Sequence, residues 1–254
     1  MVVRRTRRAV AAAVAVGLIG LVAVGCSEAR TPVAAAVTAA PGEHAEVLAT
    51  LPAAVDGAKI VVGRPAAPHT VTVYVDPRCS YCAKFEASAG TVLADEAAAG
   101  NLRVEYVVAS FLDARTGGTA SARAANALRA AVDAGDGVDA GDGGDAGDGV
   151  EGGKFAEYQA ALFASQPSGG AEGGFSVDHL LRIADQVEGL RSPSFDRAVR
   201  DESYRSWVAD SQKAFEASGV GGTPTVLVDG TALPGGDALY DAAAFSKALR
   251  DAGV

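Results

Sequence analysis

One stretch of twelve residues, 71–82, restricts the fold of this chain more than any other. It begins with the run Val-Thr-Val-Tyr-Val, whose β-branched residues favour a packed strand. Pro77 ends that strand, and residues 83–99, rich in Ala, Glu, Lys and Leu, predict a helix. Cys79 and Cys82 therefore fall in the first helical turn. Free backbone N–H groups and the helix dipole favour a thiolate there, and the thiolate is the reactive form of cysteine.

The composition limits what the chain can be. Its 254 residues are enough for one sizeable domain or two small ones. Aromatic residues make up only 6%, so we expect a core of Val, Leu and Ala with a few Phe and Tyr. The formal net charge of -9 argues against a nucleic-acid partner, which needs a basic patch. The third cysteine, Cys26, lies far from the pair, and neither a disulfide framework nor a Cys-rich zinc site is predicted.

Residues 1–25 are predicted to be an export signal, because arginines between positions 4 and 8 precede an uncharged apolar stretch. The sequence Leu-Val-Ala-Val-Gly-Cys at 21–26 resembles a bacterial lipobox, in which Cys26 would be the lipidated first residue of the mature protein. It departs from that pattern at Ala23, where Leu is usual. The alternative is an uncleaved transmembrane anchor, since 17 apolar residues are near the lower limit for spanning. Either way, the rest of the chain would lie on the extracytoplasmic face of the membrane.

A flexible tether is expected over residues 26–56, which are rich in Ala, Pro, Thr and Glu without clear periodicity. No specific role is predicted for His44 in this segment. The remaining residues, 57–254, are expected to form one domain.

Strands and helices alternate in that domain. A strand at 102–109 after the first helix predicts a parallel βαβ unit, with a further strand at 58–62. Helices are expected at 119–132, from Lys154, after the N-cap Ser176 and after the N-cap Ser194, the last breaking near Asp201. His179 is expected to be an exposed polar residue. The Asp229-Gly230 turn predicts a hairpin after residues 225–228, and Asp241 can cap a final helix over 242–252.

An acidic, Gly-rich repeat interrupts the helical pattern over residues 133–153. It has almost nothing apolar to bury, and we interpret it as a disordered loop. Its spacing fits neither an EF-hand nor a Gly-rich nonapeptide calcium repeat.

Three motifs together give a resemblance to a known family. They are Asp-Pro-Arg-Cys-Ser-Tyr-Cys at 76–82, the helical pattern at 154–163, and Gly-Val-Gly-Gly-Thr-Pro-Thr at 219–225. In this order the chain resembles the thioredoxin superfamily, most closely the DsbA-like exported thiol-disulfide oxidoreductases. The resemblance implies an α/β thioredoxin-like fold with a helical subdomain inserted at about 115–218.

The resemblance also assigns site residues. It makes Cys79 the exposed nucleophile and Cys82 the buried resolving thiol, which exchange disulfides through a mixed disulfide. Pro224 would be a cis-proline beside the pair, and Thr223 would bind the substrate backbone. Ser80 and Tyr81 stand where many relatives have Pro and His, so the reduction potential and the direction of electron flow stay open.

Two carboxylates are candidates for a supporting role. Asp76 could accept a proton near Cys82 or could cap the turn at Pro77, and the sequence favours neither alternative. Glu105 is a weaker candidate, because an edge or surface position would explain it.

The expected function is disulfide formation or exchange in unfolded or partly folded exported polypeptides, without a bound cofactor. A monomer is expected, recycled by an unidentified membrane redox partner. A reductase is an alternative, and an isomerase ranks lower because the tether is too short for the usual dimerisation domain. In a different class, Cys79 and Cys82 could handle Cu(I) or Zn, with His69 as a further ligand if it came close in space.

Overall fold

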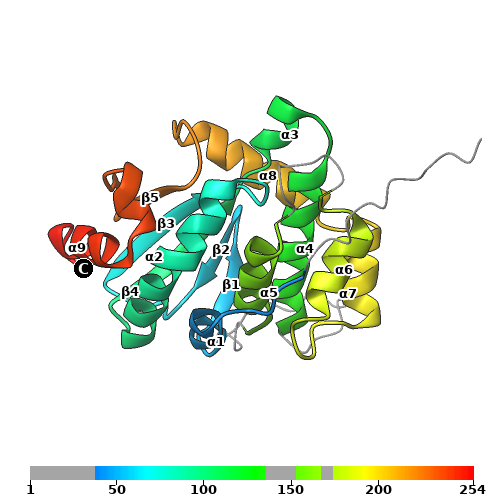
Figure 1. The fold of residues 1–254 in the computed structure, drawn as a ribbon, viewed down its shortest axis with the longest axis horizontal. Helices are drawn as coiled ribbons and strands as arrows, with labels where there is room; N and C mark the ends of the chain where they lie inside the picture. Colours follow the sequence, from blue (N-terminus) through cyan, green and yellow to red (C-terminus); the bar gives the residue numbers. More distant parts are fainter. Residues whose placement is uncertain (1–37, 136–152, 167–173) are drawn as a thin grey trace, which may run out of the picture. The chain divides into compact units, whose positions relative to one another are not determined.

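A six-stranded sheet with the order β1-β2-β4-β3-β5-β6 forms the centre of the fold (Figure 1). The computed structural model describes residues 38–135, 153–166 and 174–254, all within one compact unit. The strands are β1 (Ala53–Asp56), β2 (Lys59–Val62), β3 (His69–Val75), β4 (Leu102–Val108), β5 (Thr225–Val228) and β6 (Thr231–Ala232).

The predicted βαβ unit is confirmed. Strands β3 and β4 pair in parallel, and helix α2 (Ser80–Ala99) connects them. Gly100 ends the helix in the left-handed conformation, with φ 82°, which glycine adopts without steric penalty. Strand β5 pairs antiparallel with β3 on its other side, so β3 is central and its C-terminal end carries the Cys79 turn.

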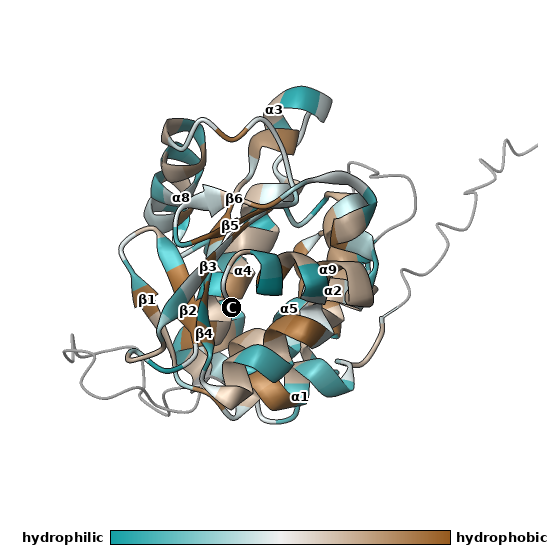
Figure 2. Ribbon diagram, turned by 90° about the vertical axis from the view of Figure 1, so that its left-hand side faces the viewer, coloured by the Kyte–Doolittle hydropathy of each residue, from teal (hydrophilic) through white to brown (hydrophobic). Residues whose placement is uncertain are grey.

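Both faces of the central strands are covered. On one face Tyr106 of β4 lies opposite Val73 of β3, and its ring is 5.5 Å from that of Phe155 of helix α5 (Gly153–Ala164). Successive residues of a strand point to opposite faces. Tyr74 accordingly faces the other side and lies against Phe215 of helix α8 (Arg205–Ala217). Hydrophobic residues follow these strands in Figure 2.

A block of helices separates β4 from β5 along the chain. It contains α3 (Phe111–Thr116), α4 (Ala120–Gly135), α5, α6 (Val177–Ala184), α7 (Pro193–Arg200) and α8. The break expected near Asp201 lies between α7 and α8. Helix α3 was not predicted. The core is built from Val, Leu and Ala with a few Phe and Tyr, as the composition predicted.

The C-terminal elements agree with the sequence pattern. Asp229 and Gly230, with φ 48° and 81°, form the turn between β5 and β6. After the short η2 helix (Gly236–Tyr240), the Asp241 side chain accepts the N–H of Ala244 at 2.8 Å. It caps α9 (Ala242–Asp251), which contacts α2.

The prediction of a flexible tether is wrong for its second half. Helix α1 (Glu43–Ala49) and strand β1 lie there, and α1 packs on α2 and α5 through the buried Ala45 and Leu48. His44 has a specific partner, because its Nε2 lies 3.3 Å from Oε1 of Glu86. The segment folds because tertiary packing stabilises a helix that, at seven residues, is too short to be stable alone.

His179 and the start of α7 also differ from expectation. His179 is buried, and its Nε2 lies 3.2 Å from the carbonyl oxygen of Ser165. Its neighbour Ser176 does cap α6, as predicted. Helix α7 begins two residues earlier than expected, with Ser192 as its N-cap instead of Ser194 and with Pro193 in its first turn.

Glu105 is neither at an edge nor on the surface. It is buried on the inner strand β4, where its Oε2 lies 2.5 Å from Nζ of Lys59. Lys59 lies on the neighbouring strand β2, and Nη2 of Arg103, on the same strand as Glu105, lies 3.6 Å from Oε1, so Glu105 forms structural ion pairs within the sheet.

Several predictions fall outside the described residues. They include the export signal, Cys26 and most of the acidic segment. The segment's first residues are helical, since α4 continues to Gly135 and the Asp133 carboxylate contacts Arg129 and Tyr204. In the described part of the chain, no helix is both long enough and apolar enough to cross a membrane.

Candidate active site

The Cys79 turn connects the end of β3 to the start of α2. Cys79 is the N-cap of α2, with φ -73° and ψ 113°, and no side chain caps this helix end by hydrogen bonding. Its carbonyl oxygen accepts the N–H groups of Cys82 at 3.0 Å and Ala83 at 3.3 Å. The first-turn position predicted for both thiols is thus confirmed, and the N–H groups of Tyr81 and Cys82 at the helix start act on the Cys79 side chain.

The two thiols have opposite environments. Cys79 is partly exposed, whereas Cys82 is fully buried. The pKa of Cys79 is lowered to about 6, mainly by a hydrogen bond from the Cys82 thiol, with help from the Thr223 side chain and from the backbone N–H groups of Cys82 and Tyr81. Burial raises the pKa of Cys82 well above its ordinary value. At neutral pH the site therefore holds one accessible thiolate beside one protonated thiol.

Thr223 and Pro224 form the opposite wall of the site. Strand pairing explains this, because Thr225 of β5 lies opposite Tyr74 of β3. The Thr223–Pro224 peptide bond is cis, as expected. In its protonated form the Cys79 thiol donates a hydrogen bond of 3.3 Å to the Thr223 carbonyl oxygen. The Thr223 hydroxyl is buried, and this side chain helps to lower the pKa of Cys79.

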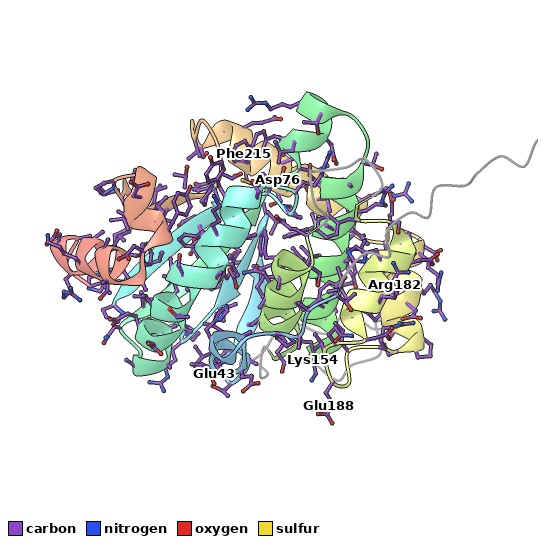
Figure 3. All side chains as sticks on the ribbon, in the orientation of Figure 1. Glu43, Asp76, Lys154, Arg182, Glu188 and Phe215 are labelled. Atoms are coloured by element: carbon purple, nitrogen blue, oxygen red, sulfur yellow. The ribbon has the colours of Figure 1, made fainter. Side chains whose placement is uncertain are left out.

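Asp76 is fully buried just before the turn. Its Oδ1 accepts the Arg78 N–H at 2.9 Å and the Ser121 hydroxyl at 2.7 Å, and its Oδ2 accepts the Leu112 N–H at 3.1 Å. Burial raises its pKa to about 6, although these donors act in the opposite direction. Figure 3 shows Asp76 at the end of the molecule where α2 begins, opposite the end that carries Glu43. Its contacts support the capping alternative.

Asp113 and Arg78 extend this network into the helical block. Asp113 Oδ1 accepts from Nη1 of Arg78 at 3.1 Å. The same carboxylate accepts the N–H groups of Ser121 and Ala122 at 2.9 Å, and so caps α4. Sequence reasoning missed Asp113 and Ser121, because the residues of the Cys79 turn to which they bind, Arg78 and Asp76, lie 35 and 45 residues earlier. Asp113 also lies too far before Ala120, the first residue of α4, to be recognised as an ordinary N-cap.

A further contact comes from the end of α5. The side-chain nitrogen of Gln166 donates to the carbonyl oxygens of Pro77 at 2.7 Å and Cys79 at 3.0 Å. No local pattern in the sequence marked this glutamine, since its partners lie 87 and 89 residues earlier.

The rim of the site is aromatic. Tyr81 is 53% exposed, the one large hydrophobic residue so exposed in the described ranges. Its ring centroid lies 5.7 Å from that of Tyr240, and Nζ of Lys84 lies 4.8 Å from the Tyr81 centroid. Burial and the charges of both cysteines raise the pKa of Tyr240.

Comparison with known proteins agrees with this geometry. A family model described as thioredoxin matches residues 56–140 and 146–251, most of the chain. The chain belongs to the thioredoxin family. No curated protein matches it.

Solved structures show the same fold in DsbA-like members of this family. BdbD from Bacillus subtilis matches with a TM-score of 0.60 at 18% identity, over 85% of this chain and 97% of that one. MdbA, a thiol-disulfide oxidoreductase from Corynebacterium diphtheriae, matches with a TM-score of 0.56 at 18% identity, over 74% and 89%. DsbA from Mycobacterium tuberculosis matches with 0.54 at 22% identity, over 76% and 88%. The predicted thioredoxin-like fold with inserted helices is thus confirmed.

The ligand set suggested for copper or zinc does not assemble. His69 lies at the start of β3, at the opposite end of this strand from the cysteines, and its Nδ1 is 2.8 Å from Oδ2 of Asp229. Among residues 38–135, 153–166 and 174–254, no three metal-ligating side chains cluster. In this member of the thioredoxin family, His69 therefore cannot complete a site with Cys79 and Cys82.

Proposed function

We propose that the protein is a thiol-disulfide oxidoreductase that forms or exchanges disulfides in exported polypeptides. The observation that carries the proposal is the contrast between the two thiols of one turn. Cys79 is accessible and its pKa is lowered to about 6, while Cys82 is buried and its pKa is raised. Thiol-disulfide exchange needs this arrangement, with one group to meet substrate and one to resolve the intermediate.

The oxidising reaction runs in two exchanges. A substrate thiolate attacks Sγ of Cys79 in the Cys79–Cys82 disulfide, forms a mixed disulfide and releases Cys82, which takes up a proton. A second substrate thiolate then attacks the substrate sulfur of the mixed disulfide and expels Cys79 as a thiolate. The substrate loses two electrons and the protein gains them. The low pKa of Cys79 makes it a good leaving group, which favours this direction.

Thr223 supports the same function from the substrate side. Its carbonyl oxygen is 3.3 Å from the Cys79 sulfur, so a peptide whose cysteine reacts with Cys79 passes directly along this backbone. We infer that unfolded or partly folded polypeptides dock there in an extended conformation, as main-chain pairing permits. Asp76 holds the turn through its three hydrogen bonds, and Pro224 forms its opposite wall.

We infer that the enzyme works on the extracytoplasmic face of the membrane, held by a lipid on Cys26. The apolar segment and the lipobox-like residues support this. The reduced pair would be reoxidised by a membrane redox partner. Mass spectrometry of the mature N-terminus tests the anchor, because a lipidated Cys26 must become residue one, whereas an uncleaved anchor would retain the arginines.

The reduction potential of the pair tests the direction of electron flow. We expect equilibration with glutathione to give a potential well above that of thioredoxin. A value near or below roughly -270 mV would instead support a reductase. A Cys82→Ala variant should accumulate mixed disulfides with exported proteins, because the resolving thiol is gone. Absence of such adducts, with Cys79→Ala as the control, would argue against catalysis.

A further inference from the structure

The end of helix α5 reaches the backbone of the redox turn through one side chain. Gln166 donates from Nε2 to the carbonyl oxygens of Pro77 and Cys79, at 2.7 and 3.0 Å. Both partners are acceptors, and the amide must therefore present its nitrogen to the turn. One NH₂ group thus joins the two carbonyls on either side of Arg78.

The position of Gln166 is fixed by its neighbour. The Ser165 hydroxyl accepts the Ala39 N–H at 2.8 Å, and the Ser165 carbonyl oxygen lies 3.2 Å from Nε2 of the buried His179. The Gln166 N–H itself donates to the Phe163 carbonyl at 3.4 Å. Contacts with the segment before α1, with α6 and with the last turn of α5 therefore hold the chain next to the amide.

The Cys79 carbonyl is also part of the start of α2. It accepts the N–H groups of Cys82 and Ala83, and the backbone N–H of Cys82 helps to lower the pKa of Cys79. A carbonyl oxygen carries partial negative charge, which disfavours a nearby thiolate. A donor on that oxygen reduces the effect and keeps the turn in the conformation that directs N–H groups at the sulfur.

We propose that Gln166 is a positioning residue for Cys79. It acts through the backbone of the turn, favours the thiolate of Cys79, and so links the inserted helical block to the redox pair. By favouring the thiolate, Gln166 stabilises the reduced form of the protein and makes the Cys79–Cys82 disulfide more oxidising. Only this redox consequence rests on the proposed function. The effect of Gln166 on Cys79 ionisation stands independently.

Gln166→Met tests the proposal, because methionine has similar length but no donor. We expect the ionisation midpoint of Cys79, followed by thiolate absorbance in the reduced protein, to rise above about 6. In the equilibrium in which two glutathione molecules reduce the protein disulfide, we expect the equilibrium constant to fall by about three- to tenfold, and tenfold corresponds to about 30 mV. Gln186→Met, at an exposed glutamine beyond α6, is the matched control and should change neither quantity.

Gln166→Glu is the second variant. It keeps the shape but replaces the donor by an anion beside the turn, so we expect a larger rise of the midpoint than with methionine. A lower melting temperature with an unchanged midpoint and glutathione equilibrium in both variants would mean a merely structural glutamine and would overturn the proposal. If wild-type protein formed no reversible Cys79–Cys82 disulfide, the proposed function would fail, while the midpoint would still decide the role of Gln166.

Discussion

In its protonated form, the thiol of Cys79 donates a hydrogen bond to the carbonyl oxygen of Thr223, a residue 144 positions later in the chain. The contact joins the two walls of the site, one built by the turn between β3 and α2 and the other by the residues before β5. The local sequence around the cysteines supplies the helix start, and the distant segment supplies the surface along which a substrate backbone can pass.

The reactivity of Cys79 should follow an ionisation midpoint of about 6. Alkylation of the reduced protein by iodoacetamide, measured from pH 4 to pH 9, checks this, and mass mapping should find the label on Cys79. Cys82 should stay unlabelled at neutral pH, since burial raises its pKa.

The Cys82 thiol is the largest single cause of that low pKa. We therefore expect Cys82→Ala to move the alkylation midpoint of Cys79 upward. Cys82→Ser keeps a hydroxyl donor and should move the midpoint less. Equal midpoints in wild type and Cys82→Ala would show that the helix start alone stabilises the thiolate.

Asp76→Ala should destabilise the protein. It leaves three donors without their acceptor, two of them backbone N–H groups, and we expect a loss of roughly 2–4 kcal/mol in the free energy of unfolding. Urea denaturation measures it. Ser121→Ala removes only one of these partners and should cost about 1 kcal/mol.

The pH dependence of this difference has a definite sign. The pKa of Asp76 is raised from 3.8 to about 6, so the native state binds its proton more tightly than the unfolded chain. The difference in the free energy of unfolding between wild type and Asp76→Ala therefore becomes smaller as pH rises from about 4 to about 6. A difference that grew with pH over this window would contradict the raised pKa.

His44 should stabilise the docking of α1 most at mildly acidic pH. Its hydrogen bond with Glu86 raises its pKa, so this stabilisation is complete below the ordinary pKa of 6.5 and is lost as pH rises through the higher folded value. We expect His44→Ala to cost about 1 kcal/mol at pH 6 and less at pH 9. In a Glu86→Gln background the pH dependence of the His44→Ala effect should disappear, and its persistence there would assign it to another group.

The acidic repeat should be dispensable for the redox chemistry. The family match omits residues 141–145, and the flanking helices end at Gly135 and begin at Gly153. Replacing residues 137–151 by a Gly-Ser linker of equal length should leave the melting temperature and the glutathione equilibrium unchanged. A replacement that starts at Asp133 should be less stable, because this carboxylate contacts Arg129 and Tyr204. Loss of redox activity in the shorter replacement would show a role for the repeat.

Local sequence patterns correctly predicted the elements whose conformation depends on residues close together in the sequence. The β-branched run of β3, the glycine after α2 and the Asp229-Gly230 turn each determine backbone conformation within a few residues. Helix α1 was missed because its seven residues have no capping side chain and depend on packing of Ala45 and Leu48.

The supporting contacts of the site were harder to predict for the same physical reason. Asp113, Ser121 and Gln166 act on groups far away in sequence, and only the packed fold defines those distances. The start of α7 is different, since Pro193 in a first helical turn already points to Ser192 as the cap. The pattern in the sequence thus favours Ser192 over Ser194 as the N-cap.

The strand order of the sheet has a consequence for the timing of folding. Strand β3 pairs with β4, which follows closely, and with β5, which follows only after the helical block. Pairing of strands that are far apart in sequence is slow to nucleate, because the entropy cost of closing the long loop comes before any stabilising contact forms. A chain that has produced the cysteines but not Thr223 therefore lacks the wall along which a substrate backbone can pass, although the start of α2 and the Cys82 thiol already adjoin Cys79. The complete docking surface arises only after residue 223 has been made and β5 has paired with β3.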